Sequence, residues 1–184
     1  MNRLIPLAEP YDPETTRLLE AYPRRDGYLL SLFRVFALSP RFLKKGVANL
    51  LDRGSPLAMR EREIVILRVT ANNGCEYEWG VHVAAFAAHV GLDRRAVSAT
   101  RAAVQPDDLW TAREGLLIRA VDGLCHDGRL NEETRSAFEA TFTQAEQLEI
   151  LALAGNYHTV SFVANVARLP PESFAARFAD YDAA

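Results

Sequence analysis

A thiol, a carboxylate and an imidazole recur at helical spacing near the middle of the chain. Cys75, Glu78 and His82 occupy positions i, i+3 and i+7. An α-helix turns by about 100° per residue, so these three side chains fall on one face. Cys75 follows Gly74 at the expected start of that helix, where unpaired N–H groups and the macrodipole favour a thiolate. The pattern fits a reactive cysteine with a proton donor nearby, and it fits equally a cysteine that merely packs as a small buried hydrophobe.

Glu63 lies twelve positions before the cysteine, on the helix expected to precede it. The turn over residues 72–74 could fold that helix back onto the next one. The Glu63 carboxylate would then accept a proton or orient His82. The alternative is that Glu63 belongs to a surface cluster with Arg60 and Arg62.

Glu78 and His82 stand four residues apart, a spacing that suits a hydrogen-bonded pair or two metal ligands. No second carboxylate–histidine pair completes a four-helix metal core, so we expect neither a metal nor a cofactor. A carboxylate beside Cys75 would raise the thiol pKa, so we expect Glu78 to contact His82 instead. Cys75 would then have a depressed pKa and share a cavity with Glu63, Glu78 and His82.

Other side chains could complete a pocket around these groups. Trp79 has helical spacing that suits either the core or a pocket wall. Tyr157 and His158 interrupt a long apolar helix and could line the same pocket, although His158 could also be a core histidine. Cys125 lies in another apolar helix, where a cysteine usually behaves as a small inert hydrophobe.

Composition sets the broad class. The 184 residues suit one domain, and 49% apolar with 24% charged residues is an ordinary globular balance. A net charge of -3 gives no electrostatic footprint for nucleic acid. Two cysteines do not make a disulfide framework, and neither a signal peptide nor a membrane span is apparent. We therefore expect a cytoplasmic protein with no nucleic-acid or membrane partner.

Start and stop signals predict an all-α fold with roughly eight to ten helices. Asp12-Pro13, Asp93, Asn131 and the Thr143/Glu146 capping box mark helix starts. No stretch predicts a hairpin. The expected helices cover about residues 13–22, 27–38, 40–53, 56–73, 75–90, 93–102, 106–127, 131–142 and 143–169, with a last turn toward the C-terminus.

Early helices carry more apolar side chains than one domain of this length should expose. A surplus of this kind is commonly buried between subunits, so we expect a homo-oligomer. The side chains concerned are Leu29, Leu30, Leu32, Phe33, Phe36, Phe42, Leu50 and Leu51.

The stretch REREIVILRVTANNGCEYEWGVHVAAFAAHVGL, residues 60–92, resembles the carboxymuconolactone decarboxylase and alkyl hydroperoxidase D-like (AhpD-like) superfamily. LAGNYHTVSFVANVARL, residues 153–169, resembles the final helix of that family. The resemblance implies an oligomeric helical bundle. It also implies one AhpD-like domain over residues 1–184, with an N-terminal arm and helices in 1–54 and the family core in 55–169.

Two branches of the superfamily match different residues. Glu63, Cys75 and His82 match the glutamate, first cysteine and histidine of the hydroperoxidase branch, whereas Glu78 replaces its second cysteine. A dithiol that cycles through an internal disulfide needs both sulfurs. The decarboxylase branch has a glutamate and a histidine at Glu78 and His82 but no cysteine at Cys75. This chain therefore combines features of both.

The resemblance implies a peroxidase-related, peroxiredoxin-like oxidoreductase. Cys75 would attack a hydroperoxide, His82 would supply the leaving-group proton, and Glu63 would orient His82. An external thiol would then reduce the enzyme unless Cys125 lies within disulfide reach. One alternative is a lyase or isomerase that acts on a small carboxylate-bearing ring compound. Another is a non-catalytic oligomeric scaffold.

In the lyase reading, proton transfer is assigned to Glu78 and His82, and Cys75 merely lines the pocket. Arg60, Arg62 or Arg68 would bind the substrate carboxylate.

Overall fold

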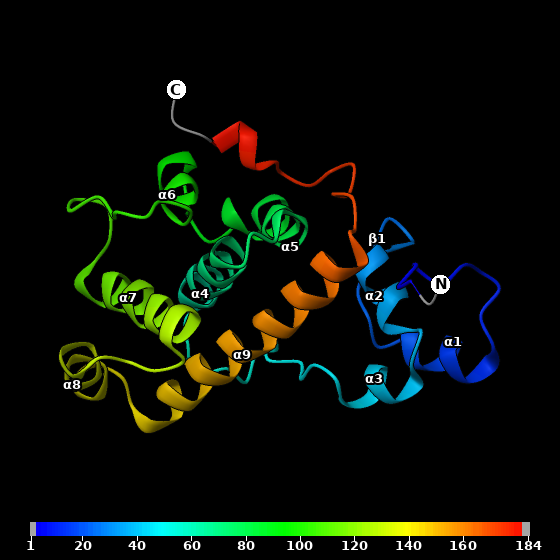
Figure 1. Cartoon of the computed structure of the whole chain (residues 1–184), viewed down its shortest axis with the longest axis horizontal. Helices are drawn as coiled ribbons and strands as arrows, with labels where there is room; N and C mark the ends of the chain where they lie inside the picture. Colours follow the sequence, from blue (N-terminus) through cyan, green and yellow to red (C-terminus); the bar gives the residue numbers. More distant parts are fainter. Residues whose placement is uncertain (1–2, 182–184) are drawn as a thin grey trace.

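Nine α-helices account for most of residues 3–181, the part of the chain that the computed structural model describes, and they confirm the all-α prediction (Figure 1). A two-stranded hairpin, a π-helical turn and a 3₁₀ turn complete the secondary structure. The elements are α1 (Pro13–Leu19), β1 (Arg24–Arg25), β2 (Tyr28–Leu29), α2 (Ser31–Phe36), α3 (Pro40–Lys45), α4 (Met59–Asn72), α5 (Glu76–His82), η1 (Val83–Ala87), α6 (Arg94–Ala99), α7 (Ala112–Asp127), α8 (Glu132–Thr141), α9 (Gln144–Ala167) and η2 (Phe178–Tyr181).

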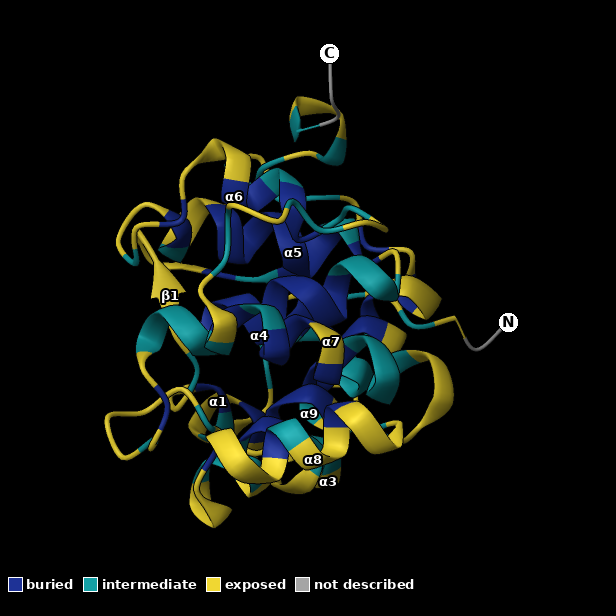
Figure 2. Ribbon diagram, turned by 90° about the vertical axis from the view of Figure 1, so that its left-hand side faces the viewer, coloured by how far each residue is buried: buried dark blue, intermediate teal, exposed yellow. Residues whose placement is uncertain are grey.

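Helix α4 forms the centre of the fold and packs against α5, α7 and α9. Every residue from Glu63 to Thr70 is buried, so α4 is covered on all sides (Figure 2). A helix that is buried all round needs partners for its polar side chains. The Arg68 guanidinium finds one in Asp122 of α7, with Nε–Oδ1 and Nη2–Oδ2 distances of 2.6 and 2.9 Å.

Local capping residues determine where several helices begin. The Asp12, Asp93 and Asn131 side chains accept hydrogen bonds from backbone N–H groups of the first turns of α1, α6 and α8. Thr143 and Glu146 form the expected capping box of α9. These side chains satisfy donors that a helix start otherwise leaves unpaired, which is why the sequence located these starts correctly.

Two early segments differ from the prediction. The helix expected from Gly27 is preceded by the β1–β2 hairpin, whose turn residues Asp26 and Gly27 have φ values of 50° and 82°. An Asp-Gly pair suits this left-handed turn, but two-residue strands are too short to show an alternating pattern. The helix expected over residues 40–53 ends at Lys45, and the chain continues to α4 without regular structure.

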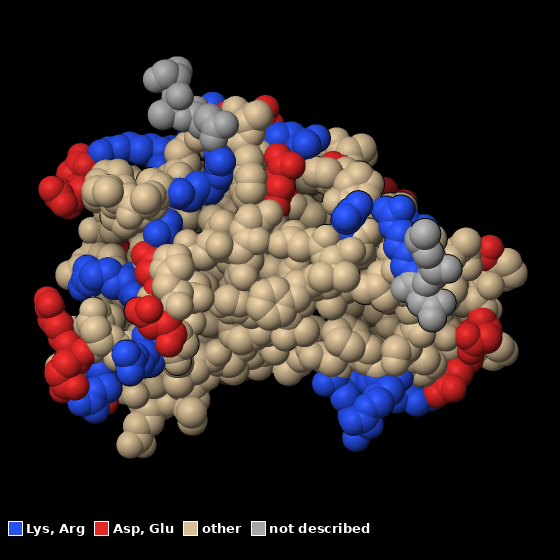
Figure 3. All heavy atoms as spheres, viewed as in Figure 1, with Lys and Arg blue, Asp and Glu red and all other residues tan. Residues whose placement is uncertain are grey.

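The apolar side chains of residues 27–51 mostly pack within the chain. The expectation that they form an exposed surplus to be buried between subunits is therefore wrong. Leu29, Leu32 and Phe36 are only 3%, 1% and 4% exposed. Exposed apolar side chains lie instead on α9, at Leu148, Leu151, Phe162 and Val166. In the view of Figure 3, charged side chains surround a broad uncharged face, and α9 crosses the front of the molecule in the matching ribbon view.

The segment after α9 returns across α5. Glu172 accepts a hydrogen bond from the Tyr77 hydroxyl at 2.6 Å, and the Ala176 N–H donates to the Gly80 carbonyl at 3.1 Å. A Cβ atom at Gly80 would collide with the Ala176 carbonyl oxygen, so this approach requires glycine. Within residues 3–181, none of the helices combines the length and apolar character needed to cross a bilayer.

Candidate functional site

A tight turn brings α4 and α5 side by side. Gly74 adopts a left-handed φ of 58°, and the Cys75 N–H donates to the Thr70 carbonyl at 2.8 Å. Glycine is the residue best suited to such a turn. The turn reverses the chain between Glu63 on α4 and His82 on α5, which places two residues nineteen positions apart in contact.

His82 is the centre of a buried hydrogen-bonded chain. Its Nδ1 lies 2.8 Å from Glu63 Oε2, and its Nε2 lies 2.9 Å from the Tyr157 hydroxyl oxygen. The three residues come from α5, α4 and α9, and their exposures are 3% for Glu63 and His82 and 7% for Tyr157. The sequence placed Glu63 beside His82 correctly. It named Tyr157 as a pocket residue but did not foresee this hydrogen bond.

Two carboxylates keep His82 protonated. Burial lowers the pKa of His82, but the nearby Glu63 and Glu78 carboxylates outweigh it and raise the pKa to about 10. As an imidazolium, His82 donates from Nδ1 to Glu63 and from Nε2 toward the Tyr157 oxygen. Burial raises the pKa of Tyr157 well above its usual value, so its side chain remains a phenol that has its own proton to donate. At neutral pH, His82 and Tyr157 therefore each carry a proton that they can donate.

Glu78 is only partly satisfied. Its Oε1 lies 3.5 Å from His82 Nε2, which confirms the predicted contact as a loose ion pair. Its Oε2 is buried and has no hydrogen-bond partner among the described residues. A buried carboxylate oxygen without a partner costs free energy in a folded protein and often marks a functional site. Glu78 therefore retains the capacity to accept one more proton or hydrogen bond.

Cys75 is completely buried at the start of α5. Burial raises the pKa of its thiol to about 11; the Glu78 backbone N–H opposes this shift, and the Glu78 charge adds to it. The expected depression of the pKa is therefore wrong. A helix start contributes only about 0.3–1 kcal/mol, less than the cost of burying a thiolate away from water. At neutral pH Cys75 is a thiol.

One buried residue near the cysteine escaped the sequence analysis. Ser161 is 0% exposed, its hydroxyl has no hydrogen-bond partner within residues 3–181, and it lowers the pKa of Cys75. It lies four residues after Tyr157, so both fall on one face of α9. That spacing was the signal that could have identified it.

Trp79 and His158 lie apart from this cluster. Trp79 is 0% exposed, donates to the Thr100 hydroxyl at 3.0 Å, and packs against Phe178 and Tyr181 in a separate core cluster. Its side chain is a core element and not a wall of the site.

His158 points to the other cysteine. Its Nε2 lies 3.2 Å from Cys125 Sγ. Burial lowers the pKa of His158 and raises that of Cys125, so both are neutral at pH 7. Both cysteines are free thiols.

The three arginines expected to bind a substrate carboxylate have different surroundings. Arg60 pairs with Glu114 at 2.6 Å, and Arg68 pairs with Asp122. Arg62 donates from Nη1 to the carbonyls of Leu50 and Asp52, at 3.5 and 2.9 Å, and its buried Nε lacks a partner in the described part of the chain. Arg62 also lowers the pKa of Tyr157 through its charge. Among the three, Arg62 has donor capacity left near the site.

The site is closed in this conformation. Two surface pockets are found elsewhere, one over α7 and α8 and one beside Tyr11, and neither is lined by Glu63, Cys75, Glu78 or His82. Neither pocket is the shared cavity expected for these four side chains. Glu63 and Glu78 contact His82, and Glu78 acts on Cys75 through its charge. In residues 3–181, no three His, Cys, Asp or Glu side chains are grouped so as to hold a metal ion.

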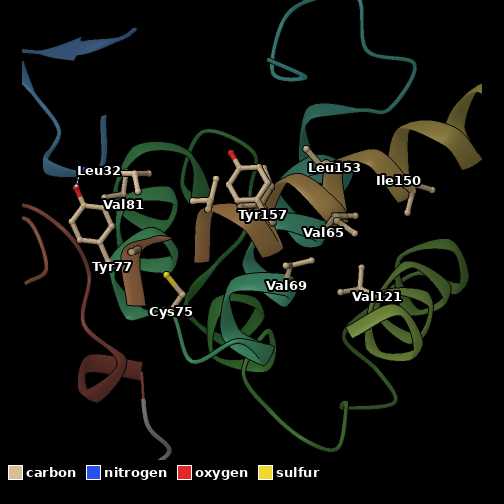
Figure 4. Close-up of a cluster of buried hydrophobic side chains, with 14 of the residues drawn as sticks. Leu32, Val65, Val69, Cys75, Tyr77, Val81, Val121, Ile150, Leu153 and Tyr157 are labelled. Carbon is tan, nitrogen blue, oxygen red and sulfur yellow. Dashed lines mark hydrogen bonds between the residues drawn. The ribbon is translucent and has the colours of Figure 1, made fainter. Parts of the chain in front are cut away.

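Figure 4 shows Cys75 and Tyr157 within the main cluster of buried hydrophobic side chains. Cys75 and Tyr157 both lie among buried apolar side chains, including Val69 and Val81. The environment around the thiol and the imidazolium is therefore of low dielectric, which strengthens charge interactions inside it.

Comparisons with known proteins bear on the fold and on the sequence around the site. A crystal structure of an uncharacterized peroxidase-related protein from Silicibacter sp. TM1040 superposes with a TM-score of 0.75 at 20% identity, covering 97% of this chain and 98% of that one. No curated protein matches by sequence. Residues 41–122, which contain Glu63, Cys75, Glu78 and His82, match the model of the carboxymuconolactone decarboxylase family. Residues 41–122 therefore match the carboxymuconolactone decarboxylase family, and the chain has the all-α AhpD-like fold.

Proposed function

We propose that this protein is a peroxidase-related thiol enzyme that reduces a hydroperoxide with Cys75 alone. The observation that carries the proposal is the buried, unpartnered Oε2 of Glu78, one helical turn after Cys75 and in contact with protonated His82. Glu78 stands where a second cysteine would be, and in this proposal it works as a base in place of a second thiol.

Proton removal must accompany the attack. With a pKa of about 11, only about one Cys75 in ten thousand is a thiolate at pH 7. Glu78 takes the thiol proton as Sγ attacks the terminal oxygen of the hydroperoxide and the O–O bond breaks. The alkoxide leaves and takes a proton that His82 Nε2 supplies through the Tyr157 hydroxyl. The products are a Cys75 sulfenic acid and an alcohol.

The site then regains its starting protonation state without a proton from outside. Protonated Glu78 returns its proton to neutral His82, which restores the carboxylate and the imidazolium. Glu63 keeps the His82 ring oriented through its 2.8 Å contact with Nδ1. An external thiol reduces the sulfenic acid with loss of water to give a mixed disulfide, and a second thiol releases Cys75.

Entry requires a movement, because Cys75 is 0% exposed. The segment between α3 and α4 is a candidate. Arg62 of α4 binds this segment by donating to the Leu50 and Asp52 carbonyls. Asn156 of α9, next to Tyr157, also binds it, because its amide donates to the Ala48 carbonyl at 3.0 Å. A small hydroperoxide needs only a narrow opening.

The raised pKa of Cys75 favours a second candidate, a lyase or isomerase that acts on a small carboxylate-bearing compound. In that case Glu78 removes a proton from the substrate and His82 returns one elsewhere on it. Arg62, with its unpartnered Nε, would bind the substrate carboxylate.

Substitution of the two cysteines and Glu78 separates these functions. The assay follows consumption of tert-butyl hydroperoxide with a small dithiol as reductant, and tests a panel of carboxylate-bearing ring compounds in parallel. We expect Cys75→Ser to abolish hydroperoxide turnover and Cys125→Ala to retain it. Turnover that survives Cys75→Ser would refute the thiol proposal. Conversion of a panel compound that survives Cys75→Ser but not Glu78→Gln would favour the second candidate, and inactivity throughout would favour a scaffold.

A further inference from the structure

Ser161 is a buried hydroxyl that acts on Cys75, whose pKa it lowers, without making a hydrogen bond of ordinary geometry. It is 0% exposed, and its Oγ has no hydrogen-bond partner of ordinary geometry among the described residues. A hydroxyl in an apolar interior usually has a partner, because an unpaired one loses its bonds to water without compensation. Its presence at this position calls for a group that it binds only at some stage of the reaction.

The packing of α9 against α5 shows what faces Ser161. Asn165 donates from Nδ2 to the Asn73 carbonyl at 2.9 Å, just before α5 begins, and Tyr157 contacts His82 at its end. The two helices are therefore antiparallel. Ser161 lies midway between Tyr157 and Asn165, one turn from each, and so faces the first part of α5.

Two groups with unused capacity meet at this place. The first part of α5 carries Cys75 and Glu78, and the Oε2 of Glu78 is also buried without a partner. The effect of Ser161 on the pKa of Cys75 agrees with a hydroxyl beside the sulfur. A thiol, a hydroxyl and a carboxylate oxygen thus converge from two helices, and the last two each lack one hydrogen bond.

We infer that Ser161 and Glu78 together hold the sulfenic acid that forms on Cys75, an inference that rests on the proposed thiol function. The Ser161 hydroxyl donates to the sulfenic oxygen, and the sulfenic O–H donates to Glu78 Oε2. Oxidation of the sulfur therefore supplies the partner that each group lacks in the reduced protein.

This arrangement has a chemical consequence for the single-cysteine site. A second oxidation requires the sulfenate anion to attack another hydroperoxide, which yields a sulfinate and an alcohol. Glu78 disfavours that anion in two ways: its negative charge repels the sulfenate, and its Oε2 accepts a hydrogen bond from the sulfenic O–H, which stabilises the neutral acid. Ser161 is a positioning residue that keeps the oxygen against Glu78. The pair replaces the protection that a second cysteine would give by forming a disulfide.

The test compares Ser161→Ala with Thr159→Ala in a Cys125→Ala background. Thr159 lies on the same helix, and its hydroxyl donates to the Gly155 carbonyl at 3.3 Å, away from the cysteine. Each protein receives tert-butyl hydroperoxide, and samples taken over time are treated with dimedone. Intact-mass measurement then gives the ratio of the trapped sulfenic acid to the sulfinic acid.

We expect Ser161→Ala to convert sulfenic to sulfinic acid several-fold faster than Thr159→Ala and the background protein, when the three are compared at equal extents of the first oxidation. Thermal melting should show that Ser161→Ala folds, because it removes only an unpartnered hydroxyl. Equal sulfenic lifetimes in all three proteins would overturn the inference alone. If the background protein itself gives no dimedone adduct, the proposed function fails and the role of Ser161 fails with it.

Discussion

Replacement of Glu78 by glutamine should make Cys75 a stronger acid and yet a poorer catalyst. Glutamine has the size of glutamate but carries no charge and accepts no proton in this range. The substitution therefore removes two properties that act in opposite directions on the thiol: the repulsion that disfavours the thiolate and the base that removes the thiol proton.

The size of the electrostatic change follows from the spacing on α5. Side chains three residues apart lie about 5–6 Å from each other, and two charges at that distance repel by about 3 kcal/mol at an effective dielectric constant near 20. That energy corresponds to about two pKa units. The Cys75 pKa should therefore fall from about 11 to about 9 on Glu78→Gln substitution. Burial, the largest cause of the raised value, remains.

The thiol titration is best measured by ultraviolet absorbance of the thiolate in a Cys125→Ala background, which leaves Cys75 as the one cysteine in the sequence. At pH 8 the thiolate fraction should rise about a hundredfold. Hydroperoxide turnover should nevertheless fall, because no carboxylate takes the thiol proton during attack. A pKa that stays near 11 would show that Glu78 does not act on the sulfur. A lower pKa combined with faster turnover would refute Glu78 as the base.

Three further predictions concern pH, stability and assembly. The pKa of His82 is about 10 when folded and near 6.5 when unfolded, so its stabilisation is complete below about pH 6.5 and is lost as the pH rises toward 10. The free energy of unfolding should fall by about 1.4 kcal/mol per pH unit between these values, and urea titrations of His82→Gln should lack that slope. Arg68→Ala removes the buried guanidinium from its pair with partly exposed Asp122 and should lower the unfolding free energy by about 3 kcal/mol. Arg135→Ala, in an exposed pair, should change the denaturation midpoint little. We also expect a homo-oligomer that buries the uncharged face of α9; sedimentation should show that Phe162→Glu weakens it, and a monomeric parent protein would contradict this.

Periodicity and capping rules predicted the local parts of the site. The common face of Cys75, Glu78 and His82 follows from helical spacing, and the return of Glu63 follows from the Asn-Asn-Gly turn. These relations involve residues at most nineteen positions apart. The contact of Tyr157 with His82 joins residues seventy-five positions apart, and no local pattern encodes which turn of α9 faces α5.

The burial of Cys75 and the placement of Trp79 could not be predicted from the sequence. A cysteine at a helix start has a depressed pKa only where water or cations reach it, and the depth of Cys75 depends on α9 and on the C-terminal segment. The same limit applies to Trp79, whose helical spacing fits the site as well as it fits the core. Its placement was decided by Phe178 and Tyr181, about a hundred residues later in the chain.

The division of the site between α4–α5 and the late helix α9 affects how the protein folds. The Glu63–His82 pair depends on a local turn, whereas the cover over Cys75 requires α9, which is made last among the long helices. Pairing between distant segments is slower than local pairing, because more chain entropy is lost before contacts form. A folding intermediate with α4 and α5 in place but α9 undocked would expose Cys75 to water, and its pKa would return toward that of a free thiol. In such an intermediate the cysteine would be more reactive than in the finished protein, so the rate of its alkylation during refolding would report when α9 docks.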